Sequence, residues 1–128
     1  MSQTVSTNEP LSARLARVSK KQTLLLTHFG RKTGKPYRVR IWFTVDGDQV
    51  NLQTMNMKRQ WIKNVQARPK VSLQIGGETF EGEVRQVTEQ GEMAQVVKLM
   101  KRKYPIALPY LWIKKAPDGA FRVTLSKV

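Results

Sequence analysis

The sequence predicts an α+β domain built on a small antiparallel β-barrel of about six strands with flanking helices. Segments in which apolar and polar residues alternate recur along the chain, and short turns rich in glycine join several of them, as in β-hairpins. Segments with apolar residues three or four positions apart, as in amphipathic helices, come before, between and after these strands. No linker or repeat divides the 128 residues, so we expect one domain over residues 9–128 after a flexible leader of residues 1–8.

The first half of the chain is expected to hold one helix and three strands. Apolar residues at helical spacing follow Pro10, which suits a first helical turn. The next segment alternates with apolar residues on both faces and contains the only histidine, His28, which we interpret as a residue of the barrel. The predicted elements are a helix over about residues 10–19 and strands over residues 22–28, 37–45 and 50–54.

The strand over residues 37–45 is expected to have two different faces, because successive side chains of a strand point to opposite sides. One face, directed to the core, would carry Tyr37, Val39, Ile41, Phe43 and Val45. The other face, directed away from the core, would carry Arg38, Arg40, Trp42 and Thr44.

The second half is expected to hold two helices and three strands. Asn56 can cap a helix over residues 57–68, which Pro69 ends, and Thr88 can cap a later helix that runs to about Tyr104. Gly82 favours a bend in the strand that contains it. The predicted strands cover residues 71–75 and 79–87 and a final segment with Phe121, Val123 and Leu125 facing inward, preceded by the apolar segment 110–113.

Composition excludes several classes of chemistry. The chain has no cysteine and one histidine, so we expect no disulfide, no thiol nucleophile and no metal site. It has no apolar run long enough to cross a bilayer, and its first residues are polar, so we expect a cytoplasmic protein.

Basic residues dominate the charge. The formal net charge is +14 and the pI about 10.6, and no acidic residue lies between Glu9 and Asp46. Such a surface attracts phosphates, carboxylates or nucleic acid without distinguishing among them.

The segment Gly30-Arg31-Lys32-Thr33-Gly34-Lys35-Pro36 is the strongest local motif. Its glycines permit close approach of a ligand, and its three cations and threonine hydroxyl can donate to one anion. It lacks the GxxxxGK[ST] spacing of a nucleoside-triphosphate P-loop, and a strand follows it instead of a helix. On this fragment alone, a solvated basic turn is the more frequent explanation.

A second anion site is expected where the helix begins after Asn56. The first backbone N–H groups of a helix lack partners within it, here near Met57, Lys58, Arg59 and Gln60. The two sites would flank the strand face with Arg40 and Trp42 and would suit an elongated ligand with a phosphate and a flat ring. For Trp61 we prefer ordinary core packing.

The order of these motifs resembles the deazaflavin-dependent nitroreductase family. The shared pattern is a threonine-rich strand, GR[KR][ST]G[KR]P, a hydrophobic strand ending in DGD, a loop leading to WxxN[LV]xxxP, and a valine-rich strand before IGG. It covers residues 22–87, about half of the chain. The loop TMNMKRQ departs from the family, whose members often have glycines there.

This resemblance implies a split β-barrel that binds the 8-hydroxy-5-deazaflavin coenzyme F-420. The loop of residues 30–35 would hold its phosphate and acidic tail, and the loop before WxxN would support the ring and phosphate. The implied site, together with the polar strand face, comprises Arg31, Lys32, Thr33, Gly34, Lys35, Pro36, Arg38, Arg40, Trp42, Thr54, Met55, Asn56, Lys58, Arg59, Gln60 and Trp61.

The implied activity is hydride transfer from the reduced coenzyme to a quinone, enone or nitro compound. Tyr104 or Tyr110 could close the pocket and donate a proton, although buried packing explains them equally well. The resemblance also implies a homodimer. Sequence leaves open an oxidoreductase that binds FMN, or a carrier that holds flavin, haem or bilin without turnover. Binding of nucleic acid or of a membrane surface is not expected, because no recognition motif accompanies the charge.

Overall fold

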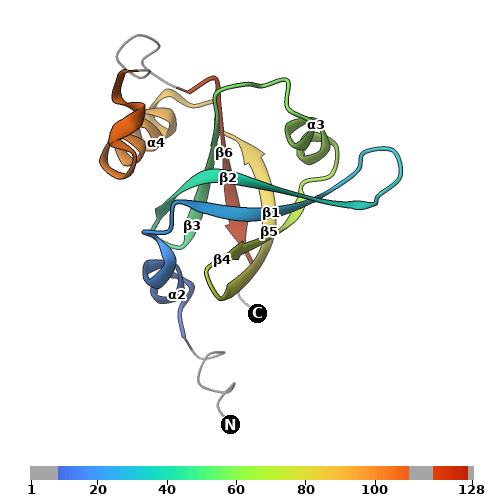
Figure 1. The fold of residues 1–128 in the computed structure, drawn as a ribbon, viewed down its shortest axis with the longest axis horizontal. Helices are drawn as coiled ribbons and strands as arrows, with labels where there is room; N and C mark the ends of the chain where they lie inside the picture. The colour runs from blue at the N-terminus through green and yellow to red at the C-terminus, as the bar shows by residue number, and fades with distance from the viewer. Residues whose placement is uncertain (1–8, 110–116, 127–128) are drawn as a thin grey trace.

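Six strands of the computed structural model close into an antiparallel barrel in the order β1-β2-β3-β6-β5-β4 (Figure 1). The structure describes residues 9–109 and 117–126. The elements are α2 (Leu11–Val18), β1 (Thr23–Phe29), β2 (Pro36–Asp46), β3 (Gln49–Thr54), α3 (Gln60–Ala67), β4 (Lys70–Ile75), β5 (Glu78–Gln86), α4 (Gln90–Lys103), the 3₁₀ helix η1 (Pro105–Ala107) and β6 (Gly119–Leu125). The predicted α+β class and six-stranded barrel are confirmed. The leader of residues 1–8, the segment 110–113 and Tyr110 lie outside the described residues.

Pairs of strands distant in sequence complete the barrel. The hairpins β1–β2, β2–β3 and β4–β5 follow the chain, whereas β1 pairs with β4, and β6 lies between β3 and β5. β2 changes partner along its length: residues 36–42 pair with β1, and residues 43–46 pair with β3. At Gly82, β5 runs so close to β6 that a Cβ atom would lie 2.4 Å from the carbonyl oxygen of Thr124. Only glycine therefore fits this position.

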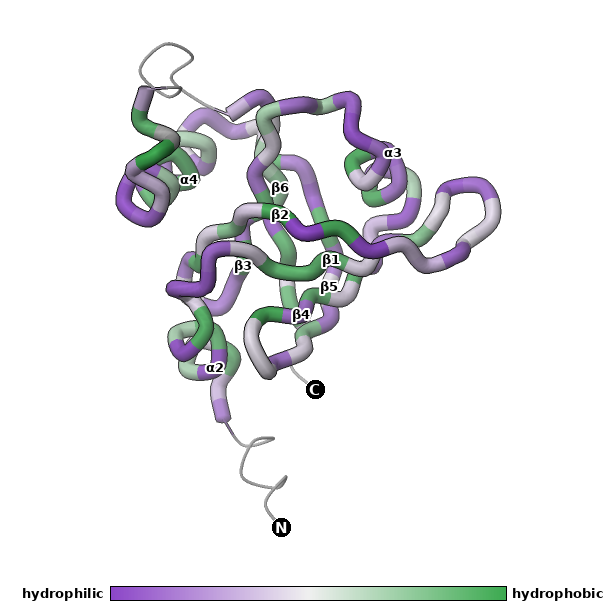
Figure 2. Tube along the Cα trace, viewed as in Figure 1, coloured by the Kyte–Doolittle hydropathy of each residue, from purple (hydrophilic) through white to green (hydrophobic). Residues whose placement is uncertain are grey.

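The core fills the barrel and extends to α2 and α3. Leu24 and Leu26 of β1, Phe43 of β2 and Leu52 of β3 are fully buried, and Leu15 of α2 joins the same cluster. Each such side chain contributes roughly 1.5–3 kcal/mol when it is buried. In Figure 2, hydrophobic colour runs along β1 through the middle of the barrel, whereas the turn between β1 and β2 is mostly hydrophilic or neutral. The core thus leaves this turn available to solvent and ligands.

The two faces of β2 differ from the prediction at both ends of the strand. Tyr37, expected in the core, is 47% exposed because it lies in the part of the hairpin that projects beyond the barrel. Thr44, expected on the open face, is buried, and Trp42 is half-buried. The reason is α4, whose C-terminal Tyr104 stacks on Trp42 with ring centroids 4.2 Å apart. The second face of β2 is therefore partly covered.

Two side chains at the C-terminal end of α4, Lys103 and the C-cap residue Tyr104, complete the backbone bonding where β2 leaves β1. If the pairing of β1 with β2 continued by one residue, Gln22 would pair with Phe43. The Tyr104 hydroxyl lies between these two residues instead. It is 2.6 Å from the Gln22 carbonyl oxygen and accepts a hydrogen bond from the Phe43 N–H at 3.1 Å. Lys103 Nζ donates to the Phe43 carbonyl oxygen at 2.9 Å and lies over the Phe43 ring. Burial raises the pKa of Tyr104 to about 12 and lowers the pKa of Lys103 to about 8.

Both predicted helix caps are wrong. α3 begins at Gln60 and α4 at Gln90, with Arg59 and Glu89 at the N-cap positions and no capping side-chain hydrogen bond at either. The Asn56 side chain instead accepts from the Lys58 N–H at 2.9 Å, which closes a turn before the helix. Asparagine offers the same acceptor to a turn as to a cap, so sequence could not separate the two.

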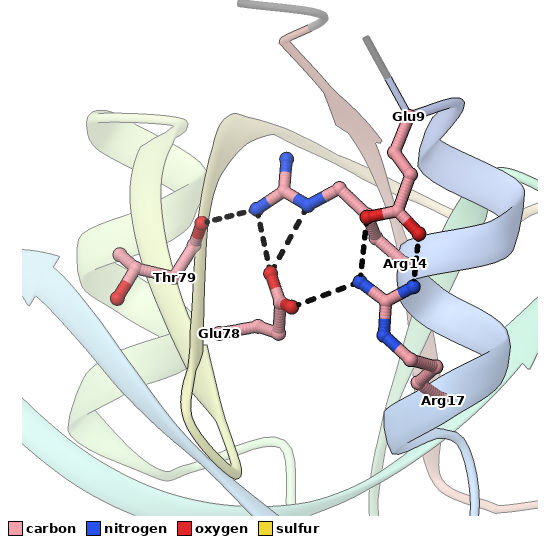
Figure 3. A network of polar contacts seen from close by, with 5 residues as sticks. All are labelled: Glu9, Arg14, Arg17, Glu78 and Thr79. Carbon is pink, nitrogen blue, oxygen red and sulfur yellow. Dashed lines mark hydrogen bonds and ion pairs between the residues drawn. The ribbon is translucent and has the colours of Figure 1, made fainter. Parts of the chain in front are cut away.

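An ionic network joins α2 to the start of β5 (Figure 3). Glu78 accepts from Arg14 at 2.9 Å and from Arg17 at 3.1 Å, and Arg17 also pairs with Glu9. These arginines lower the pKa of Glu78 through hydrogen bonds. Because the network is partly exposed, its ion pairs contribute little to stability, and the apolar face of α2 supplies most of its attachment.

Among the helices of the described residues, none is both long and apolar enough to cross a membrane.

Candidate functional site

A cavity of about 810 Å³ lies between the β1–β2 turn, the loop before α3 and the first turns of α3. Its floor includes His28, Val39, Trp61 and Asn64, and its rim includes polar and basic side chains of both loops. The lining residues are His28, Gly30, Arg31, Lys32, Thr33, Tyr37, Val39, Asn56, Lys58, Arg59, Gln60, Trp61 and Asn64.

The charge of this cavity is entirely positive. Arg31 and Lys32 reach it from the turn, Lys58 and Arg59 reach it from the loop before α3, and no aspartate or glutamate lines it. Guanidinium and ammonium groups bind phosphate and carboxylate oxygens through charge-assisted hydrogen bonds. The cavity is therefore suited to an anionic ligand.

The basic turn has a defined backbone shape. The Gly30 N–H donates to the Lys35 carbonyl oxygen at 2.9 Å, and the Gly34 N–H donates to the Gly30 carbonyl oxygen at 2.8 Å. Gly34 has a φ of 76°, in the left-handed region that favours glycine, and the Arg68 guanidinium lies against it. These bonds hold Arg31 and Lys32 on the side of the turn that borders the cavity.

Asn64 of α3 ties the turn to the barrel. Its side-chain oxygen accepts from the Arg31 backbone N–H at 3.2 Å and from Arg31 Nη1 at 2.8 Å. The side-chain oxygen of Gln60 also accepts from Arg31 Nη1, at 3.1 Å. Its side-chain nitrogen lies 3.0 Å from His28 Nδ1. The position of the Arg31 guanidinium is thus set by two side chains of α3.

His28 is buried on β1 and stacks against Tyr37 with ring centroids 5.9 Å apart. Burial lowers the pKa of His28 below its ordinary 6.5, because it disfavours the charged imidazolium. The expectation that His28 belongs to the barrel is confirmed, and the same ring also lines the cavity.

A smaller cavity of about 260 Å³ adjoins the first and shares Val39, Asn56, Arg59 and Trp61 with it. Arg40, Trp42, Gln53, Thr54 and Met55 are among its other lining residues. Gln53 is buried: its nitrogen donates to the Thr44 hydroxyl at 2.8 Å, and its oxygen has no partner among the described residues. An unpaired buried acceptor is costly, so this glutamine lowers the stability of the barrel locally.

Most of the predicted site residues line the two cavities. The first cavity contains Arg31, Lys32, Thr33, Asn56, Lys58, Arg59, Gln60 and Trp61, and the second adds Arg40, Trp42, Thr54 and Met55. Gly34, Lys35, Pro36, Arg38 and Tyr104 line neither cavity. The preference for core packing of Trp61 is also confirmed, because this ring is 4% exposed and packs edge-on against Phe121.

One part of the predicted anion site is wrong. The N–H groups of Lys58 and Arg59, expected to be free at a helix start, bond to the side-chain and backbone oxygens of Asn56. At these two positions, attraction of an anion therefore depends on the side chains of Lys58 and Arg59.

Sequence reasoning missed Asn64, Tyr37, Val39 and Gln53 as lining residues. Asn64 could have been found, since it is the asparagine of the WxxN motif and follows Trp61 by three positions on the same helix. Gln53 gave no signal, because a glutamine in an alternating strand usually faces solvent. Within the residues that the structure describes, no cluster of acidic or histidine side chains could hold a metal ion.

Comparisons with known proteins identify proteins that are similar to this chain. The sequence model of a family described as F-420H2-dependent quinone reductase matches residues 3–110. No curated protein matches the chain. Among solved structures, an F-420-H2 dependent reductase is 22% identical over 80% of this chain and 94% of its own, with a TM-score of 0.67.

Two further structures show how widely the fold is used. A chain described as a domain-swapped dimer is 25% identical over 80% of both chains, with a TM-score of 0.67. HutZ from Vibrio cholerae, described as a haem storage protein, is 18% identical over 92% of both chains, with a TM-score of 0.67. The latter likeness concerns the fold alone.

Proposed function

The chain belongs to the F-420H2-dependent quinone reductase family, and on that premise we propose that its two adjoining cavities bind coenzyme F-420 and present it to a quinone. The family makes the protein an oxidoreductase with this deazaflavin as cofactor, as the resemblance implied. The acceptor and the residues that bind the coenzyme are our proposal.

The observation that carries the proposal is a cavity lined by four cations and no acidic residue, beside a second cavity that Trp42 lines. Arg31, Lys32, Lys58 and Arg59 would hold the phosphate and the acidic tail. Trp42, which is half-buried and lines the second cavity, would offer a flat surface to the ring.

When bound, the reduced coenzyme supplies a hydride, and the protein supplies binding and orientation. The basic turn, with Lys58 and Arg59, would fix one end of the ligand, and the second cavity would hold the ring, so that one ring face meets the acceptor. Tyr110 remains a proposed proton donor. Tyr104 is a weaker one, since its hydroxyl is bonded to Gln22 and Phe43 and its pKa is raised.

Titration of the purified protein with F-420 and, in parallel, with FMN tests this function. We expect F-420 to bind at micromolar or lower concentration and more tightly than FMN, and the loaded protein to reduce a quinone. Arg31→Ala should weaken F-420 binding roughly tenfold to hundredfold, because a hydrogen bond to a charged group is worth about 1.5–3 kcal/mol. Lys63→Ala, an exposed cation of α3 outside both cavities, is the matched control.

If FMN binds more tightly than F-420, the protein is a flavin oxidoreductase on the same barrel and the proposed coenzyme is wrong. Binding without turnover of quinones, enones or nitro compounds would indicate a carrier. Equal affinity of Arg31→Ala and the unchanged protein would contradict the proposed phosphate site.

We also propose a homodimer, in line with the relative described as a domain-swapped dimer. Sedimentation equilibrium would give the mass directly.

A further inference from the structure

The hydrogen bonds around Asn64 determine which nitrogen of His28 carries its proton. The Arg31 backbone N–H and guanidinium can only donate, so the oxygen of the Asn64 amide must face Arg31. The NH₂ group of the same amide then faces His28 Nδ1 at 3.0 Å. Nδ1 must accept this bond and is unprotonated, which leaves the hydrogen of the neutral imidazole on Nε2.

Nε2 carries the remaining hydrogen-bond donor of the His28 ring. In the part of the chain that the structure describes, it has no protein partner, and it is not one of the polar atoms sealed from solvent. Since His28 lines the cavity together with Arg31 and Lys32, this donor faces the space that an anion would occupy. The bond at Nδ1 leaves the ring no free basic nitrogen, so the ring is placed to donate and not to remove a proton.

We propose that His28 binds the ligand directly, with its Nε2–H donating a hydrogen bond to a phosphate oxygen. This inference rests on the proposed function for the identity of the ligand, F-420. Asn64 acts as a positioning residue, because one amide sets both the His28 ring and the Arg31 guanidinium. A phosphate oxygen is the expected acceptor, because Arg31, Lys32 and Lys58 line the cavity that contains His28 and do not line the other cavity.

Because His28 is the single histidine of the chain, its ring nitrogens and their proton can be assigned in an NMR spectrum without overlap. In a ¹⁵N–¹H correlation spectrum of the labelled protein, we expect Nδ1 to be unprotonated and Nε2 protonated. Saturation with F-420 should shift Nε2 and slow exchange of its proton with water. Histidine resonances that do not change at saturation would overturn the proposal while leaving the function intact.

Two substitutions separate the donor from the bulk of the ring. His28→Phe removes the donor and should weaken F-420 binding roughly tenfold to hundredfold, whereas His28→Gln keeps an N–H near the position of Nε2 and should stay within about threefold. Neither should change the affinity for the deazaflavin riboside that lacks the phosphate and tail. Equal losses for both ligands would contradict a contact with the phosphate.

Outcomes of the two proposals can be told apart. If the unchanged protein fails to bind F-420, the proposed function is wrong, and a shift of Nε2 on addition of inorganic pyrophosphate would still support an anion contact at His28. Absence of both shifts would overturn the inference. Thermal unfolding of each variant reports its folding, and the spectra of the unchanged protein decide the matter if His28→Phe does not fold.

Discussion

The oxygen and the nitrogen of the Asn64 side chain are both hydrogen-bonded, so replacing the nitrogen should change the pKa of His28. In Asn64→Asp, a carboxylate oxygen replaces the NH₂ group that donates to His28 Nδ1. The new oxygen needs a donor and carries negative charge, and both effects favour the imidazolium. We expect the pKa of His28 to rise relative to the unchanged protein, in which burial lowers it.

An NMR pH titration of the one histidine measures this shift. Lys63→Ala, also on α3, should leave the pKa of His28 where it is. An unchanged or lower pKa in Asn64→Asp would show that Asn64 does not donate to His28.

The residue chemistry of the site was more predictable than its contacts. Arg31 and Lys32 were found because cations and glycines together in a turn already suggest an anion site. The WxxN motif contains Asn64, but the motif does not name its partners, which lie 33 and 36 positions earlier in the chain. Tyr37 was misplaced because alternation continues past the point where the hairpin leaves the barrel.

At the scale of elements, the junction of β2 with Tyr104 is the most vulnerable contact. Tyr104→Phe removes the hydroxyl that bonds Gln22 and Phe43 and leaves buried backbone groups without a partner. The expected cost is about 1–3 kcal/mol of unfolding free energy, measured by urea denaturation. Tyr37→Phe, at an exposed tyrosine, should change it by less than about 0.5 kcal/mol. Equal stability of Tyr104→Phe and the unchanged protein would contradict this role.

The same hydroxyl gives a signature at alkaline pH. The pKa of Tyr104 is raised to about 12 in the folded protein from its ordinary 10, so between these values the unfolded chain releases a proton that the folded protein keeps. Stability conferred by Tyr104 therefore falls as pH rises through this window. The contribution of Lys103 to stability rises with pH between its pKa of about 8 in the folded protein and its ordinary value of 10.5. Above pH 10.5, the stability of the unchanged protein should therefore fall more steeply than that of Tyr104→Phe.

Strands were easier to predict than helix ends. Alternation located all six strands within a few residues, since a strand with one buried face must repeat every two residues. Helix starts failed at Asn56 and Thr88, because a polar side chain before a helix can serve a turn equally well. The order in which the strands pair could not be read locally, because β1 meets β4, and β3 meets β6, far along the chain.

For the whole molecule, the net charge of +14 opposes compactness through self-repulsion. Added salt screens this repulsion, so we expect the melting temperature to rise by a few degrees between low and physiological ionic strength. Calorimetry in sodium chloride measures the change. The partly exposed Glu78 network would act in the opposite sense, and a falling melting temperature would mean that such pairs outweigh the net repulsion.

The position of β6 between β3 and β5 has a consequence for synthesis on the ribosome. Residues 119–125 follow the other five strands, so the sheet β5-β4-β1-β2-β3 keeps two unpaired edges until this segment has left the exit tunnel. Open edges pair readily with other chains. A nascent chain stalled before residue 119 should therefore be retained by chaperones, and its release should coincide with the emergence of β6.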